Sequence, residues 1–209
     1  MKKDATLSKP SAPTKFKWNA HIQYFVFIHQ HDTVMRGALV DRGENGGIAG
    51  DDLKIIATSD RKLDVSGIDN HELTGLKIVI AGGVVTSQRD KIVVIFHQFA
   101  YVPGGKTIIL CPQLESFGII IDNKSKVLKR GEQCITTLEG YVIPMNSING
   151  LPYIPIRPFP NAEWNTLPHI ILTSDMEWDP SFLDHNITND DNPIEAFPLN
   201  PTNYNNSEN

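Results

Sequence analysis

A carboxylate at the end of an apolar run is the first candidate for chemistry in this chain. Three small or aliphatic residues, 38–40, lead into Asp41, Gly43 follows two positions later, and a glycine-rich run extends to Gly50. A strand would fix the position of the Asp, and the glycine would let backbone N–H groups approach and hydrogen-bond its carboxylate. The pattern therefore suggests acid–base chemistry at Asp41.

An Asp-x-Gly sequence also has an ordinary structural explanation. Asp and Gly dominate β-turns, because Asp hydrogen-bonds the nearby backbone and Gly adopts positive φ at no steric cost. These residues alone do not separate the catalytic loop of an aspartic peptidase from a plain surface turn. Other features of the sequence are needed to distinguish a catalytic loop from a surface turn.

Length and charge bound the possible functions. The 209 residues can form one domain of ordinary size with tails, or two small domains. The net charge of −5 argues against nucleic acid as the main partner. Residues 1–17 carry five lysines and one acid, and no Lys or Arg follows Arg157. We therefore expect a disordered basic tail at 1–17 and an irregular, acidic, Pro- and Asn-rich tail at 158–209.

The remaining polar residues indicate no cofactor and no metal. Cys111 and Cys134 form no C-x-x-C pair and no disulfide framework, so we expect free thiols in a reducing, cytoplasmic compartment. His29 and His31 share a strand face but have no third ligand in view. The sequence shows neither a signal peptide nor a run of ~20 apolar residues, so no membrane association is expected.

Short apolar runs separated by Gly, Pro and polar turns predict an all-β fold, either a barrel or a sandwich. A hairpin is expected over 21–40, with Asp41 at the end of its second arm. An apolar strand from residue 107 is expected to lead into a short helix or turn near 112–115, and one helical turn is expected at 161–164. Further strands are expected at 53–56, 62–68, 76–81, 91–97, 117–122, 134–138, 141–145 and 153–156.

Several motifs in fixed order carry a family resemblance. They are Leu39-Val40-Asp41-Arg42-Gly43 with Gly50, then Tyr101-Val102-Pro103-Gly104, then Ile108-Ile109-Leu110 and Gln113-Leu114. Over roughly residues 36–157 they resemble the protease region of copia-type LTR retrotransposon polyproteins. The resemblance implies a retropepsin-like closed β-barrel over 18–118. It also implies a strand-rich connector over 119–157, like the region that this family places between protease and integrase.

The resemblance also implies a function. Asp41 and Gly43 would form the catalytic loop of an aspartic endopeptidase that cleaves its own polyprotein through an activated water. Because the chain has one Asp-x-Gly loop, the Asp dyad would need a homodimer. Gly67, Ile68 and Asp69 would belong to a flap over the substrate, and Ile108, Ile109 and Leu110 to a second loop behind the dyad. The protein would act inside the cell, in the cytoplasm or in virus-like particles, without a cofactor.

Three residues depart from the family pattern. Arg42 replaces the usual Ser or Thr, whose hydroxyl ties the two catalytic loops together; Glu44 replaces an Ala and Thr107 an Asn. A guanidinium near the dyad would oppose the shared proton, unless it turns to solvent or pairs with Glu44. A catalytically degenerate domain that only binds peptide or self-associates is therefore the rival hypothesis. A further alternative is an unrelated β-rich binding module with Asp41 in a surface turn.

Overall fold

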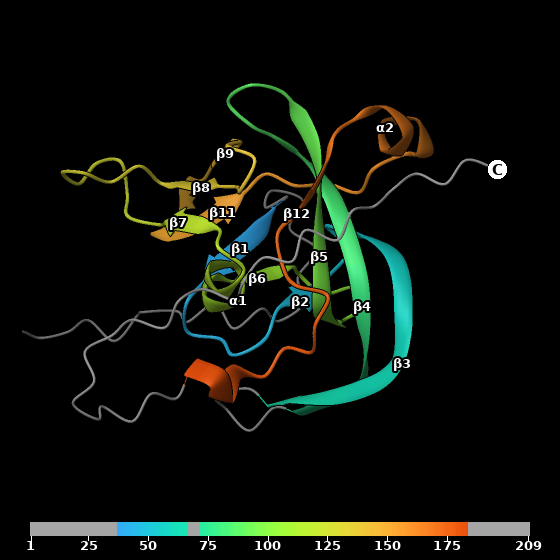
Figure 1. Cartoon of the computed structure of the whole chain (residues 1–209). Coiled ribbons are helices and arrows are strands. Elements are labelled where there is room, and N and C mark those ends of the chain that lie inside the picture. Colours follow the sequence, from blue (N-terminus) through green and yellow to red (C-terminus); the bar gives the residue numbers. More distant parts are fainter. Residues whose placement is uncertain (1–36, 67–71, 184–209) are drawn as a thin grey trace, which may run out of the picture. The chain divides into compact units, whose positions relative to one another are not determined.

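The computed structural model describes residues 37–66 and 72–183, all of which belong to one compact unit. Strands dominate this part of the chain (Figure 1). The expectation of an all-β fold is confirmed. The tail predicted at 1–17, most of the hairpin predicted at 21–40 and the end of the chain from 184 lie outside the described residues.

The main sheet has nine strands within the described ranges. Their order is β10-β11-β1-β6-β2-β5-β4-β3, and β12 pairs with β5 beside this path. Three pairs are parallel, namely β1 with β6, β2 with β5 and β12 with β5. The strands are β1 (Ala38–Asp41), β2 (Ile48–Ala49), β3 (Lys54–Ser66), β4 (Glu72–Thr86), β5 (Lys91–Tyr101), β6 (Ile108–Leu110), β10 (Asn146–Ile148), β11 (Leu151–Ile154) and β12 (His169–Ile171).

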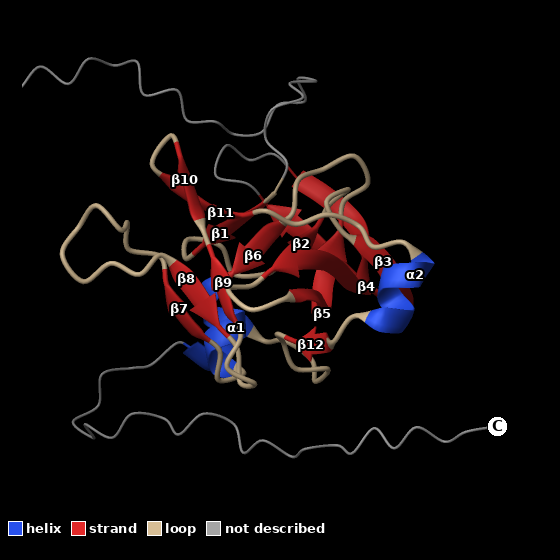
Figure 2. Cartoon of the chain, turned by 90° about the horizontal axis from the view of Figure 1, so that it is seen from above, coloured by secondary structure: helices blue, strands red, loops and turns tan. Residues whose placement is uncertain are grey.

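A smaller antiparallel sheet follows the short helix α1 (Cys111–Ser116). Its strands are β7 (Ile120–Asp122), β8 (Cys134–Thr136) and β9 (Val142–Pro144). Figure 2 shows this sheet beside α1 and the end of β1. The smaller sheet thus covers the side of the main sheet on which β1 and β6 end.

The core centres on β5, the most apolar strand of the chain. Residues 92–97 are all buried, because both faces of β5 are covered: Val94 and Phe96 belong to the main buried cluster, and Val93 and Ile95 pack in a second cluster that includes Phe159. Phe96 and Phe99 are fully buried, with ring centroids 4.9 Å apart. Strand β5 also carries a bulge: Gln98 has a φ of 60°, and two residues of β5, 97 and 98, lie opposite one residue of β4, Ile80. The bulge directs Gln98 out of the regular strand alternation.

The closed barrel expected from the resemblance is not found among the described residues. The pairing path ends at β3 on one side and at β10 on the other. Closure would require these two strands to pair, and both present mostly exposed or half-exposed side chains. With little apolar surface to bury at either edge, the described sheet is open.

The tail expected to be irregular over 158–209 is partly ordered, which corrects that prediction. It holds α2 (Asn161–Thr166), β12 and the 3₁₀ turn η1 (Pro180–Leu183). Phe159, Ile170 and Leu172 are at most 5% exposed. Ile170 is ordered by the pairing of β12 with β5, a partner more than 70 residues earlier in the chain, and Phe159 by packing on Val93 and Ile95 of that strand.

Candidate active site

Asp41 lies at the carboxyl end of β1, where a buried strand reaches the surface. Ala38, Leu39 and Val40 are at most 8% exposed, and Asp41 is half-buried. The parallel pairing of β1 with β6 sets Asp41 opposite Leu110. The strand holds its last residue in a fixed position, so the carboxylate is presented on a rigid base.

The carboxylate of Asp41 accepts a hydrogen bond from the loop that follows it. The N–H of Gly43 donates to Asp41 Oδ1 at 2.9 Å. A Cβ at position 43 would lie 3.5 Å from the same oxygen, an ordinary van der Waals distance. The hydrogen bond expected of an Asp-x-Gly loop is present, although the single chain does not require glycine at this position.

The glycines that this loop does require lie further along. A Cβ on Gly47 would approach the ring of Phe99 to 2.3 Å, and a Cβ on Gly50 would approach the carbonyl oxygen of Gly105 to 2.2 Å. A Cβ on Gly46 would meet nothing within 4 Å. Gly47 and Gly50 therefore let the loop lie directly on β5 and on the turn before β6.

The residues of the predicted second loop lie beside the strand that carries Asp41. Ile108 pairs with Leu39 and Ile109 with Val40. Ile109 and Leu110 are fully buried. They support β1 from within the core, and α1 begins directly after them.

Thr107 ties the two loops together through both its main chain and its side chain. Its Oγ1 accepts a hydrogen bond from the N–H of Gly50 at 3.1 Å, and its carbonyl oxygen accepts one from Leu39 at 3.0 Å. The residue is fully buried. Thr107, which stands where the family has Asn, thus connects the glycine-rich loop with β1.

Arg42 pairs with Glu115 on α1, and not with Glu44, which the sequence had suggested as its ion-pair partner. Its guanidinium donates to both carboxylate oxygens of Glu115, at 2.8 and 2.6 Å, and to the carbonyl oxygen of Ile121 at 3.3 Å. The carboxylate of Glu115 offsets the positive charge that would otherwise act on Asp41. The hydroxyl that the family uses to join its loops still has no counterpart at position 42.

Glu44 places a second carboxyl group near Asp41. Burial first, and the charge of Asp41 second, raise the pKa of Glu44 above the usual carboxyl range. Glu44 is therefore held in an environment that disfavours its charged form.

We expect Glu44→Gln to stabilise the fold at neutral pH. A carboxyl group whose pKa is raised by folding contributes stability below its unfolded-state pKa, and loses that contribution as the pH rises through the folded-state pKa. The variant should therefore have a higher urea midpoint than the wild type at pH 7, and the gap should close near pH 4, at about the unfolded-state value. Urea denaturation between pH 4 and 8 measures this gap, with the exposed Glu139→Gln as control. A gap that stays constant with pH would contradict the placement of Glu44.

The predicted flap falls on the hairpin of β3 and β4. The two strands pair antiparallel, and the N–H of Gly75 donates to Asp64 Oδ1 at 2.7 Å. Gly67, Ile68 and Asp69, the residues assigned to the flap, lie outside the described residues. The hairpin arms lie on the same sheet as Asp41, with β6, β2 and β5 between them and β1.

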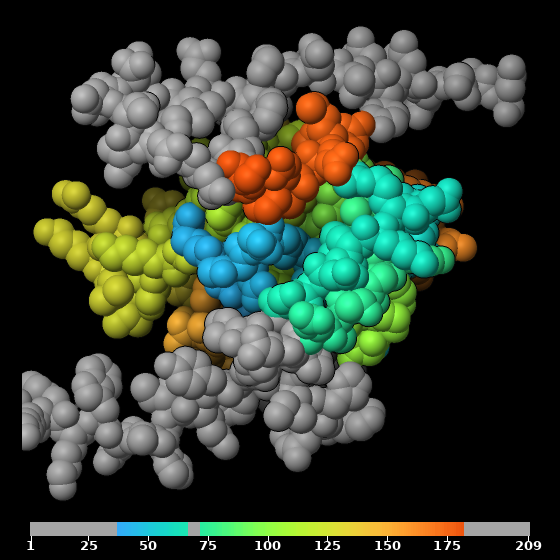
Figure 3. Space-filling model, turned by 90° about the horizontal axis from the view of Figure 1, so that it is seen from below, coloured from blue at the N-terminus to red at the C-terminus, as the bar shows by residue number. Residues whose placement is uncertain are grey.

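Sequence reasoning missed the C-terminal segment as a neighbour of this loop. Figure 3 shows residues after β12, in orange, lying against the exposed residues of the Asp41 loop, in blue. Trp178 Nε1 donates to the carbonyl oxygen of Asn45 at 2.8 Å. In the sequence, Trp178 stands out as an aromatic residue among acidic ones, but nothing there indicates which part of the fold it contacts.

Cys111 does not supply a nucleophile here. Its thiol is fully buried at the start of α1, and burial raises its pKa to about 11. A thiol with that pKa is protonated at neutral pH, and the thiolate is the reactive form.

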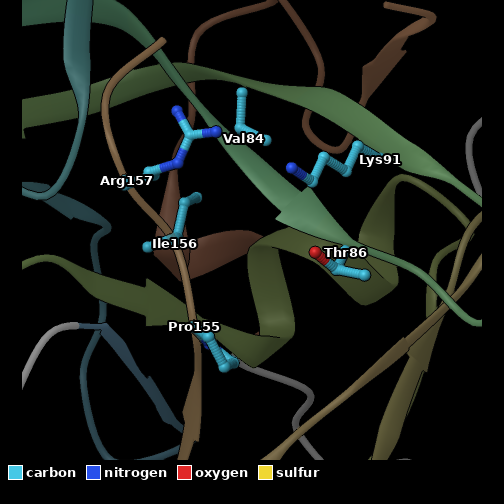
Figure 4. A pocket seen from close by; sticks show the side chains of 6 residues that line it. All are labelled: Val84, Thr86, Lys91, Pro155, Ile156 and Arg157. Carbon is cyan, nitrogen blue, oxygen red and sulfur yellow. The ribbon is translucent and has the colours of Figure 1, made fainter.

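A pocket lies elsewhere among the described residues (Figure 4). It has a volume of about 320 Å³, and Lys91 and Arg157 reach toward it from opposite sides. Arg157 pairs with Glu163 at 2.6 Å, which offsets its charge. None of the lining residues comes from the Asp41 loop; they are Val84, Thr86, Lys91, Pro155, Ile156 and Arg157.

The described residues hold neither a cluster of metal ligands nor a helix that could span a membrane. No three side chains of His, Cys, Asp or Glu come together there as metal ligands. No helix in that part of the chain is long and apolar enough to span a membrane. His29 and His31 lie outside the described ranges.

No family model, curated protein or solved structure matches this chain. The resemblance to retroelement proteases therefore depends on the order of the sequence motifs alone.

Proposed function

We propose that the protein is a retropepsin-type aspartic endopeptidase of a copia-type retroelement, active as a homodimer on its own polyprotein. The observation that carries this proposal is the placement of Asp41. Its carboxylate stands at the exposed end of a buried strand, hydrogen-bonded by the amide of Gly43 at 2.9 Å. The parallel β6 and the helix that follows it support this strand from behind.

The chemistry requires two carboxyl groups. Two carboxylates about 3 Å apart cannot both ionise, so the pair shares one proton. The ionised member takes a proton from a water molecule, whose oxygen adds to the peptide carbonyl. The protonated member supplies a proton during the collapse to a carboxylic acid and an amine. One chain contributes one Asp-x-Gly loop, so the second carboxyl group is Asp41 of another copy.

A catalytically degenerate domain that binds peptide without cleaving it is the second candidate. The lack of a hydroxyl at position 42 favours this candidate, because the loop then loses a cross-link of the active family. The Arg42–Glu115 ion pair ties the same loop to α1 instead. The side chains of both residues are partly exposed to solvent, at 45% and 35%, so this tie is a weak one.

Self-processing tests the enzyme hypothesis. The full chain, fused to its neighbouring polyprotein segments, would be incubated at mildly acid pH as wild type and as Asp41→Asn. We expect the wild type to cleave itself, and the variant to lose roughly a thousand-fold or more of this rate. The matched control is Asp90→Asn, an exposed turn residue that should cleave like the wild type. Cleavage by Asp41→Asn at the wild-type rate would contradict the proposal. No cleavage by a folded wild type would favour the second candidate, a domain that binds peptide without cleaving it.

A further inference from the structure

The segment after β12 crosses the face of the molecule that carries the Asp41 loop. Its start is firmly held: the N–H of Leu172 donates to the carbonyl oxygen of Ile95 at 2.9 Å. The hydroxyl of the buried Thr173 accepts from the N–H of His97 at 2.6 Å and donates to the carbonyl oxygen of His97 at 3.1 Å. Beyond Thr173 the side chains become mostly exposed, while the chain continues toward the loop (Figures 1 and 3).

Three polar contacts hold the exposed part of the segment. Gln98, at the bulge of β5, donates from Nε2 to the carbonyl oxygen of Asp175 at 2.9 Å. The guanidinium of Arg61, on β3, pairs with the carboxylate of Glu177. These two acceptors lie two residues apart, so a short stretch spans the distance between β5 and β3.

The third contact reaches the loop that follows the candidate catalytic residue. Trp178 Nε1 donates to the carbonyl oxygen of Asn45, four residues after Asp41. The side chain of Trp178 is half-buried, whereas Met176 between the anchors is 62% exposed. The segment is thus held at separate points by an acid and an aromatic residue.

We propose that residues 174–181 occupy, in cis, a peptide-binding face formed by Asn45, Arg61 and Gln98, and that this face binds extended peptides with an acidic residue followed by an aromatic one. The identification of this face as the substrate face rests on the proposed endopeptidase function. Arg61 selects the acid by charge, and the carbonyl oxygen of Asn45 selects a ring N–H. The segment acts as a displaceable strap that competes with substrate.

The contacts that hold the strap are weak enough for a substrate peptide to displace it. An exposed ion pair and a single neutral hydrogen bond are each weak contacts, because both replace interactions with water. Such contacts keep the strap in place chiefly because it is tethered, which gives it a high effective concentration at the face. A free peptide of the same sequence therefore competes poorly with the intact strap, and well once the strap's own anchors are removed.

Binding of a labelled peptide in trans tests the proposal. The probe is a fluorescein-labelled peptide with the sequence of residues 173–181, and its anisotropy is followed on adding the full chain. All proteins carry Asp41→Asn, so that binding is measured apart from cleavage. We expect the further change Glu177→Gln with Trp178→Ala to strengthen binding of the probe about ten-fold or more. Met176→Ala, in the middle of the same segment, should leave binding unchanged.

Substitution of Arg61 is the second part of this test. In the strap variant (Glu177→Gln with Trp178→Ala), adding Arg61→Gln should abolish the gain in probe binding. Adding Arg157→Gln should not, because Arg157 is similarly exposed but pairs with Glu163. In the chain with an intact strap, Arg61→Gln alone should speed amide hydrogen exchange over 174–183. A strap variant that binds the probe no better than its parent, or a gain insensitive to Arg61→Gln, would overturn the proposal. The predicted gain in probe binding, together with no self-processing by the wild-type chain, would refute the enzyme hypothesis and still support this peptide-binding face.

Discussion

Gly50→Ala is expected to destabilise the fold by about 3 kcal/mol or more. A Cβ at this position would lie 2.2 Å from the carbonyl oxygen of Gly105 and 2.6 Å from its carbonyl carbon. These are backbone atoms, so they cannot move aside as a flexible side chain would. The same shift would break the hydrogen bond from the N–H of Gly50 to Thr107 Oγ1, which is buried. Both loops beside Asp41 would then be displaced.

Urea denaturation followed by circular dichroism measures this loss. The matched control is Gly46→Ala, four residues earlier in the same loop, where an added Cβ meets nothing within 4 Å. We expect the control to change the free energy of unfolding by less than about 0.5 kcal/mol. Equal stability of the two variants would show that the loop does not lie against Gly105.

Phe99→Ala is expected to cost about 3–5 kcal/mol of stability. The ring is fully buried, packs on Phe96 at a centroid distance of 4.9 Å, and lies directly under Gly47. Its removal leaves a cavity beneath the loop that carries Asp41. We therefore expect cleavage to fall more steeply with temperature in this variant than in the wild type.

The control for the core substitution is Val127→Ala, because that side chain is 92% exposed. Its free energy of unfolding should lie within about 0.5 kcal/mol of the wild type. Denaturation of both variants under the same conditions gives the comparison. A loss below about 1 kcal/mol for Phe99→Ala would contradict the placement of this ring in the core.

Local patterns were enough to predict the strands around Asp41. The apolar run before Asp41 and the run at 91–97 are strands because their side chains are aliphatic, β-branched or aromatic, and both are bounded by turn residues. The run at 108–110 is a strand for the same reason, with Pro112 early in the helix that follows. In these places local preference and tertiary structure agree.

Long-range pairings could not be predicted from local patterns. Glu115 is 73 residues from Arg42, and nothing near Arg42 indicates this partner over Glu44. Strand β12 gains its order from β5, and an acidic, Pro-containing stretch gave no sign of it. The open sheet has the same origin, because closure depends on which distant edges meet, and β3 and β10 do not meet among the described residues.

The proposed dyad of two Asp41 carboxyl groups in a homodimer is tested most directly by mixing wild-type and Asp41→Asn chains in varied proportions before dimers assemble. Total protein stays constant, and cleavage of a polyprotein peptide is followed. If each active site needs Asp41 from both copies, activity follows the square of the wild-type fraction, so an equal mixture keeps about one quarter. A linear fall, with about half of the activity left in the equal mixture, would show that each chain works alone and would contradict a dimeric aspartic peptidase.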